Sequence, residues 1–198
     1  MTKIIGLTGG IGSGKTTIAN HFKSLGIPIY IADEEAKKLM QSDEIVKAIK
    51  ERFGADLFEN DILNRGKLAE AVFNDPDKLK QLNAIVHPAV KNHFKQWILE
   101  HNEFPTVIYE AAILFESGSY KDFDTIITVT APIETRIQRV IARDNTSREQ
   151  VLKRIEAQWT DEQRISKSDF VIENESIEKS LIEIERILKI LKIRQNES

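Results

Sequence analysis

The sequence contains no cysteine, which excludes both disulfide bonds and thiolate chemistry. It also lacks an apolar run near the roughly 20 residues that a membrane-spanning helix needs, and it does not open with a basic segment followed by an apolar one. We therefore expect a cytoplasmic protein. The formal net charge of −3 provides no general attraction for nucleic acid or for a membrane surface, so neither is expected as a partner.

What the sequence does contain is ordinary for a globular enzyme: 198 residues, of which 41% are hydrophobic and 30% are charged. This length suits one α/β domain over residues 1–198 with a small inserted lobe. It leaves the oligomeric state open between a monomer and a small homo-oligomer. No internal repeat or low-complexity segment interrupts the chain.

A glycine-rich segment at residues 9–16 fits the pattern G-x-x-x-x-G-K-[ST] at every fixed position. An apolar run at residues 3–8 reads as a buried strand before it. Ile18, Phe22 and Leu25 mark one face of a helix after it. A strand, a glycine loop and a helix N-terminus make an anion site, because unpaired backbone N–H groups and the helix dipole converge there.

This segment predicts a site for a nucleoside triphosphate. Lys15 would reach the β- and γ-phosphates, and the Thr16 hydroxyl would ligate Mg²⁺. The residues expected to hold the nucleotide are Gly10, Ile11, Gly12, Ser13, Gly14, Lys15, Thr16 and Thr17.

A second apolar strand is expected at residues 27–31, and Asp33 follows it at its carboxyl end. Because ligands of open parallel sheets bind outside the carboxyl ends of the strands, topology places Asp33 beside the glycine loop. We interpret it as a catalytic carboxylate. It can also be the N-cap of a helix over residues 34–40, and the two roles are compatible.

Residues 42–102 show amphipathic helical patterns and no strand of comparable strength. Pro88 lies inside the longest pattern and should kink or split that helix after His87. So much helix between two strands predicts an inserted lobe that closes over an acceptor substrate. Arg65 and His87 are its distinctive polar residues, and on sequence alone each is as well explained by a structural role.

Two further strands are expected at residues 106–110 and 125–130. Glu110 ends the first of them and so supplies a second carboxylate at the same edge of the sheet. Three interpretations remain open. Glu110 holds Mg²⁺ through water, orients the acceptor, or is a buried carboxylate bonded to nearby backbone.

Arg136, Arg139 and Arg143 fall on one face of the next predicted helix. One interpretation is a solvated stripe neutralised by Glu134 and Asp144. The other is a lid over about residues 136–160, whose guanidinium groups bind phosphate. A nucleotide site favours the lid. A fifth strand at residues 170–172 precedes a closing helix, whose apolar stripe should pack on the sheet rather than form a dimer seam.

Together these segments resemble the dephospho-CoA kinase family over nearly the whole chain. The motifs that carry the resemblance are Leu7 to Lys15, Ala32-Asp33, Leu63-Asn64-Arg65, His87-Pro88, Leu114-Phe115-Glu116, Arg139 with Arg143-Asp144, and Asp169 to Ile172 with Asn174. The resemblance implies a P-loop nucleoside-kinase fold of the α/β class: a parallel five-stranded sheet flanked by helices, a helical CoA-binding lobe and a lid. It also implies that ATP, with Mg²⁺, phosphorylates the ribose 3′-hydroxyl of dephospho-CoA.

Within that resemblance Asp33 would accept the proton of the 3′-hydroxyl. Lys15, Arg139 and Arg143 would neutralise the phosphate charge. Arg65 and His87 would lie on the CoA side, and Glu110 would face the substrate. The chain departs from the family pattern at Tyr30-Ile31-Ala32, where Asp-Ala often precedes the aspartate, and at Ala112, where proline is common.

Two other functions are compatible with parts of the sequence. The first is another small-molecule kinase of the same fold, which the sequence leaves open. The second is a GTPase-like switch, and the absence of an Asn-Lys-x-Asp guanine-reading motif argues against it.

Overall fold

A computed structural model describes residues 2–73 and 75–193 of the chain. It falls into two compact units, which are described separately below. The first unit comprises residues 1–31 and 101–198, and the second comprises residues 32–100. In the part of the chain that the structure describes, no helix is long and apolar enough to cross a membrane.

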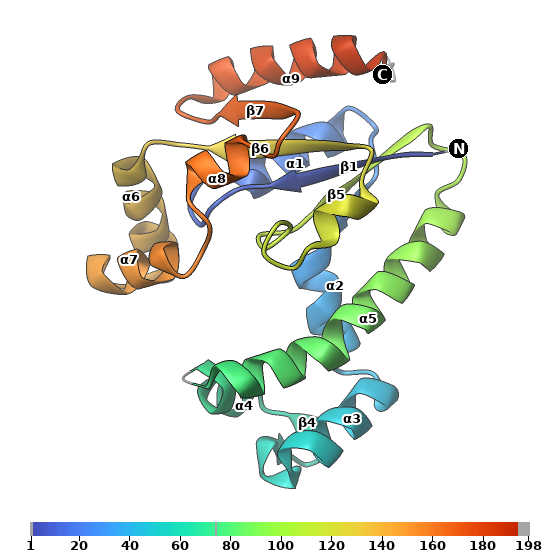
Figure 1. Ribbon diagram of the computed structural model, residues 1–198, viewed down its shortest axis with the longest axis vertical. Coiled ribbons are helices and arrows are strands. Elements are labelled where there is room, and N and C mark those ends of the chain that lie inside the picture. Colours follow the sequence, from blue (N-terminus) through green and yellow to red (C-terminus); the bar gives the residue numbers. More distant parts are fainter. Residues whose placement is uncertain (1, 74, 194–198) are drawn as a thin grey trace. The chain divides into compact units, whose positions relative to one another are not determined.

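A five-stranded, wholly parallel sheet forms the centre of the first unit, in the order β2-β5-β1-β6-β7 (Figure 1). Its strands are β1 (Lys3–Thr8), β2 (Ile29–Ile31), β5 (Thr106–Glu110), β6 (Thr125–Thr130) and β7 (Phe170–Glu173). The central strands are rich in isoleucine, valine and threonine and almost fully buried, as parallel strands covered on both faces must be. The sequence prediction of this sheet is confirmed, although β2 begins two residues later than expected.

The helices of this unit are α1 (Lys15–Ser24), α6 (Ile133–Asp144), α7 (Arg148–Glu156), α8 (Asp161–Ile165) and α9 (Ile177–Leu191), with a 3₁₀ turn at Ser119–Asp122. Ile18 and Phe22 of α1 share one core cluster with Ile184 and Leu188 of α9 and with residues of the strands. The prediction that the closing helix packs on the sheet is therefore confirmed.

The short helix α8 was not predicted. Its N-terminus carries a capping box, in which the Thr160 hydroxyl accepts from the backbone of Gln163 while the Gln163 side chain accepts from the backbone of Thr160. A helix of five residues has too few apolar positions to show a helical period, so the capping residues are the only local signal of it.

The second unit contains α2 (Ala32–Leu39), α3 (Asp43–Phe53), a 3₁₀ turn (Ala55–Leu57), β3 (Phe58–Glu59), β4 (Ile62–Leu63), α4 (Arg65–Phe73) and α5 (Pro76–Glu100). It has a core of its own, formed by Ile45, Ile49, Leu57, Leu63, Leu68 and Val72. This unit is therefore a compact body, and it includes α2 as well as most of residues 42–102, the range of the predicted helical lobe.

Two details of this region go beyond what its sequence pattern predicts. Residues 42–102 show no strand as strong as those of the sheet, but β3 and β4 form a small antiparallel hairpin whose turn places Asn60 and Asp61 at positive φ. Of the two outcomes expected at Pro88, a kink or a split, the split does not occur, because α5 runs continuously for 25 residues. Val86 and Val90 are buried on either side of the proline, so packing holds the helix together despite the missing hydrogen bond. In Figure 1 the ribbon of α5 changes direction partway along.

Candidate active site

The glycine loop joins the end of β1 to the start of α1, and Lys15 is the first residue of that helix. Gly12 and Gly14 have φ values of 79° and 89°, a left-handed conformation that disfavours side chains. The unpaired N–H groups of the first turn of α1 follow directly. The loop therefore has the backbone of an anion site, as its motif predicts.

The same glycines are also required by contacts within the protein. A Cβ atom on Gly10 would lie 2.1 Å from the Arg136 guanidinium, and one on Gly12 would lie 2.5 Å from the Arg136 carbonyl oxygen. A Cβ atom on Gly14 would lie 2.0 Å from Nδ2 of Asn174. The structure thus shows that two neighbouring residues, Arg136 and Asn174, occupy the space beside these glycines.

Lys15 and Glu110 face each other across two adjacent strands. Leu7 of β1 pairs with Glu110 of β5, and the Lys15 Nζ lies 3.7 Å from the Glu110 Oε1. Both side chains are nearly buried, with 12% and 6% of their surfaces exposed. The prediction that Glu110 ends its strand at the edge of the glycine loop is confirmed, and its carboxylate balances the charge of Lys15.

Thr16 and Thr17 are exposed in the first turn of α1. The described residues contain no cluster of three or more histidine, aspartate or glutamate side chains that could hold a metal ion. A cation here would therefore depend on the Thr16 hydroxyl and on phosphate oxygens, which is how Mg²⁺ is commonly held with nucleotides. The residues present fit that arrangement.

The three arginines of the predicted stripe have three different environments. The side chain of Arg136 is buried, and its Nε donates to the Ile11 carbonyl at 2.9 Å. Arg139 donates to the carbonyl of Ser13 at 3.4 Å and to that of Asn174 at 3.0 Å. Arg143 is 62% exposed and forms two hydrogen bonds with Asp144. The expectation of one solvated or phosphate-facing stripe is therefore wrong for Arg136.

Asp144 neutralises Arg143, as expected, and it also accepts from Arg154 at 2.7 Å. These two guanidinium groups hold the pKa of Asp144 far below its usual range. Glu134, the other expected partner of the stripe, instead pairs with Arg148. Two charged groups on α6 are thus bonded to α7.

Asn174 has a positioning role that sequence reasoning did not assign. It is buried just after β7, and its side-chain amide donates to the Ser13 carbonyl at 2.9 Å and accepts from Ser180 at 3.1 Å. Only its membership in the family motif indicated it, because a single asparagine after a strand carries no local signal of such a distant contact.

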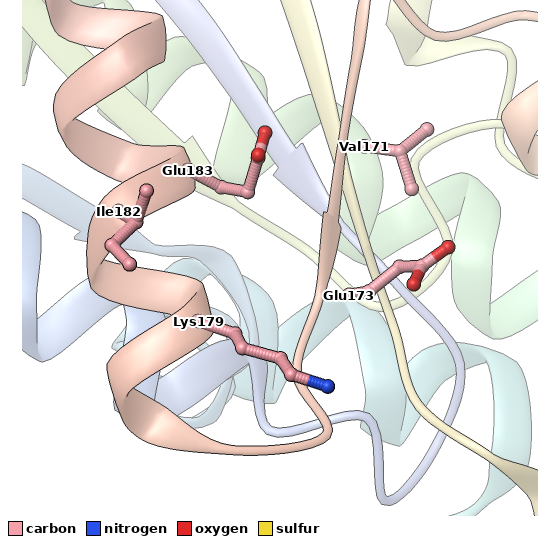
Figure 2. A pocket seen from close by; sticks show the side chains of 5 residues that line it. All are labelled: Val171, Glu173, Lys179, Ile182 and Glu183. Carbon is pink, nitrogen blue, oxygen red and sulfur yellow. The ribbon is translucent and has the colours of Figure 1, made fainter.

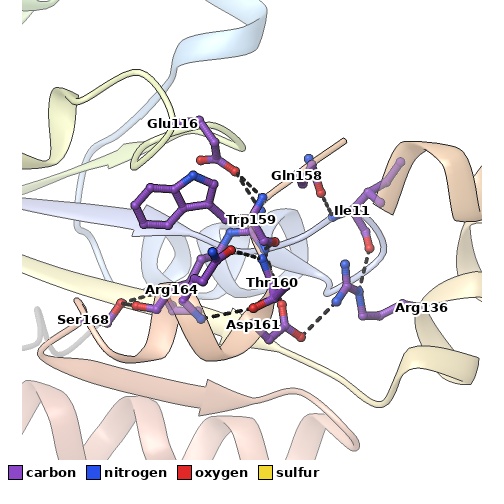
Figure 3. Close-up of polar contacts among 11 residues, drawn as sticks. Ile11, Glu116, Arg136, Gln158, Trp159, Thr160, Asp161, Arg164 and Ser168 are labelled. Atoms are coloured by element: carbon purple, nitrogen blue, oxygen red, sulfur yellow. Dashed lines mark hydrogen bonds and ion pairs between the residues drawn. The ribbon is translucent and has the colours of Figure 1, made fainter. Parts of the chain in front are cut away.

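A largely buried ionic network joins Arg136, Asp161, Arg164 and Glu116 (Figure 3). The fully buried Arg164 donates to Glu116 at 3.0 Å and to Asp161 at 3.4 Å, and Asp161 also accepts from Arg136 at 2.9 Å. The Trp159 ring stacks on Phe115, with ring centroids 5.5 Å apart. Glu116, which the sequence placed in a loop, is therefore an anchor for α8.

Asp33, Arg65 and His87 belong to the second unit. Asp33 is exposed in the first turn of α2, which begins directly after β2. The N-cap interpretation of Asp33 was wrong, because the chain passes from strand to helix without a loop. Arg65 donates to the Lys37 carbonyl at 3.0 Å. Partial desolvation lowers the pKa of His87, which favours its neutral form.

The first unit has a surface depression of about 410 Å³ (Figure 2). It is lined by Val171, Glu173, Lys179, Ile182 and Glu183. These side chains come from β7 and α9, and none belongs to the glycine loop. The depression is therefore not the nucleotide site.

Comparisons with known proteins agree with this geometry. The family model of dephospho-CoA kinase matches residues 3–179. A dephospho-CoA kinase of Bacteroides fragilis is 42% identical over 180 residues, covering 90% of this chain and 87% of the relative. One from Fusobacterium nucleatum is 40% identical over 174 residues, covering 87% and 90%.

Solved structures show the same fold. TT1252 from Thermus thermophilus has a TM-score of 0.89 at 35% identity, with 98% of each chain covered. The dephospho-CoA kinase from Campylobacter jejuni has a TM-score of 0.70 at 27% identity, with 97% of this chain and 98% of that chain covered. The shikimate kinase from Bacteroides thetaiotaomicron, at 16% identity and a TM-score of 0.53, shares the fold alone.

The parallel sheet, the glycine loop and Lys15 at the start of α1 define a P-loop kinase. Within that class the family match is specific. The chain belongs to the dephospho-CoA kinase family, and it is a phosphotransferase of coenzyme A biosynthesis that uses ATP as phosphoryl donor.

Proposed function

We propose that the chain binds ATP at residues 10–17 and transfers its γ-phosphate to the ribose 3′-hydroxyl of dephospho-CoA, giving coenzyme A and ADP. The observation that carries this proposal is the glycine loop with Lys15 at the N-terminus of α1, in a chain matched by the dephospho-CoA kinase family over residues 3–179. Backbone N–H groups there neutralise phosphate oxygens without a counterion from solvent.

In the reaction, the bond between the γ-phosphorus and its bridging oxygen breaks while the 3′-oxygen bonds to that phosphorus. Asp33 accepts the proton of the hydroxyl and aims its oxygen in line with the breaking bond. An exposed carboxylate two residues after the end of β2 supports this role, because such strand ends border the ligand crevice of parallel sheets.

Lys15, Arg139 and Arg143 stabilise the charge shared by the β- and γ-oxygens. Lys15 exchanges its contact with Glu110 for the phosphates, and Glu110 then remains as a buried carboxylate beside the substrate. Mg²⁺, held by the Thr16 hydroxyl and phosphate oxygens, would further reduce the repulsion between ATP and its attacker. Arg143 is mostly exposed, which supports a direct contact with phosphate.

Arg65 and His87 bind dephospho-CoA on the lobe. An arginine suits its phosphate groups, and a neutral histidine suits a hydrogen bond that carries no charge. The partners are these small molecules alone, and the protein acts in the cytoplasm as a monomer or a small homo-oligomer.

The test is a panel of acceptors incubated with ATP and Mg²⁺, comprising dephospho-CoA, adenosine, cytidine monophosphate and shikimate. We expect ADP release with dephospho-CoA only, together with a product of the mass of coenzyme A. Release with another acceptor and none with dephospho-CoA would overturn the proposal. The Lys15→Ala variant is the control for a contaminating kinase.

A further inference from the structure

Ile11 of the glycine loop packs against the helix pair α6 and α7. Its side chain packs against a small cluster formed by Ile137, Val140 and Val151, together with Ile141, Leu152 and Ile155. Every other member of that cluster belongs to α6 or α7. One loop residue thus completes a hydrophobic core that otherwise consists of the helix pair alone.

The backbone of Ile11 is held by the same region. Its N–H donates to Oε1 of Gln158 at 2.9 Å, and its carbonyl accepts from Nε of Arg136 at 2.9 Å (Figure 3). Arg136 lies in the first turn of α6, and Gln158 lies two residues after the end of α7. Both ends of the helix pair therefore bond to one residue of the loop.

The Arg136 side chain that makes one of these contacts has little conformational freedom. Only 4% of the surface of Arg136 is exposed, and its guanidinium is also fixed by Asp161, which Arg164 fixes in turn. A buried guanidinium that forms bonds on two sides has lost the freedom to reach a ligand. Arg136 therefore has a different role from an arginine that moves onto phosphate.

We propose that Ile11 is a positioning residue that couples the glycine loop to the helix pair, with Arg136 and Gln158 as its backbone partners. The loop then adopts its phosphate-binding shape because the base of the helix pair holds Ile11 in place. Conversely, nucleotide at the loop stabilises the helix pair through Ile11. This inference rests on the proposed nucleotide site at the loop.

The test compares Ile11→Ala with Ile141→Ala. Both isoleucines are partly buried against the same cluster, but Ile141 is part of α6 and has no bond to the loop. We expect Ile11→Ala to raise the KM for ATP by about tenfold, equivalent to about 1.4 kcal/mol of lost positioning, with little change in the KM for dephospho-CoA. Ile141→Ala should leave both KM values near those of the wild type.

The effect of ADP on amide hydrogen exchange is a second measurement, and a loss of packing alone would not change it. In the wild type and in Ile141→Ala, saturating ADP should slow amide exchange in α6 and α7. In Ile11→Ala that slowing should be lost at saturating ADP, and Ile11→Val should restore it. Gln158→Met, which keeps the length of the side chain but removes the acceptor, should reduce the slowing.

Equal KM changes in the two alanine variants, or ADP-dependent slowing that persists in Ile11→Ala, would overturn the coupling while leaving the nucleotide site intact. Failure of the wild-type protein to bind ADP would instead overturn the proposed function, and the coupling with it. If Ile11→Ala does not fold, Gln158→Met carries the comparison, with Ile11→Val as the variant that should behave like the wild type.

Discussion

The ammonium group of Lys15 and the carboxylate of Glu110 form a nearly buried ion pair, 3.7 Å apart, at the site proposed for the phosphates of ATP. Removing one member of such a pair leaves a buried charge without a partner. The consequence depends on whether nucleotide is bound, because the phosphates supply negative charge that can replace the carboxylate.

We therefore expect Glu110→Gln to lower the melting temperature of the nucleotide-free protein. Loss of one partner of a buried pair costs about 3–5 kcal/mol, and the partial exposure here places the expected loss at the lower end. Saturating ATP should restore most of the stability. Thermal melts with and without ATP check this, and an equal loss in both conditions would argue that phosphate does not replace Glu110.

Asp33→Asn should lower kcat by about 10²–10⁴-fold while leaving the affinity for ATP nearly unchanged, because the residue accepts a proton and holds no phosphate. Steady-state kinetics and ATP titration measure the two quantities. Glu34→Gln is the matched control, since Glu34 is an exposed carboxylate in the same turn of α2. A folded Asp33→Asn variant with most of its activity would leave Asp33 with no part in catalysis.

Arg143→Lys should reduce kcat sharply with little effect on the KM for ATP. Lysine keeps the charge but loses the fork that matches two phosphoryl oxygens, and arginines of this kind contribute on the order of 10³–10⁵ in related transfers. Arg148→Lys is the control, because Arg148 is an exposed arginine on α7 that is bonded to Glu134. If the two variants have the same kcat, Arg143 acts as surface charge only.

Arg139→Lys should differ from Arg143→Lys. Arg139 already bonds to the carbonyls of Ser13 and Asn174, so its replacement disturbs the loop before any transition state forms. We expect the KM for ATP to rise along with the loss of kcat, which is the signature of an interaction made in the ground state as well. An unchanged KM would favour a role confined to the transition state.

Asn174→Asp should destabilise the protein by at least about 1–3 kcal/mol, because the Ser13 carbonyl loses its shorter hydrogen bond and a carboxylate is placed at a buried position facing that carbonyl. The variant preserves the size of the side chain, so packing is not the cause. Chemical denaturation gives the free energy of unfolding. Ser180→Ala, which removes a hydrogen-bond partner of Asn174 but not the bond to Ser13, should cost less.

The sheet and the glycine loop were predictable because their signals are local. Three strands were bounded correctly from apolar runs, and the motif fixed the start of α1 to within a few residues. The ion pair of Lys15 with Glu110 was not predicted, because it depends on the strand order that places β1 beside β5.

Other features depend on contacts between distant segments. Nothing local distinguishes Arg136 from Arg143, since both lie on one helical face, yet the first is buried against the loop and the second is mostly exposed. The continuity of α5 through Pro88 likewise depends on burial of the residues around it. The hairpin of β3 and β4 has two residues in each strand, too few to show an alternating pattern.

The tight fit of the loop glycines against Arg136 and Asn174 limits the choice of inactive controls. Gly14→Ala would place a methyl group 2.0 Å from Nδ2 of Asn174, and would so disturb the junction of β7 and α9 as well as the phosphate site. A loss of activity in such a variant does not distinguish misfolding from loss of ligand binding. Lys15→Ala leaves the backbone of the loop unchanged but strips Glu110 of its partner. A change at an exposed side chain, such as Asp33→Asn, is the cleaner way to silence this enzyme in a cell.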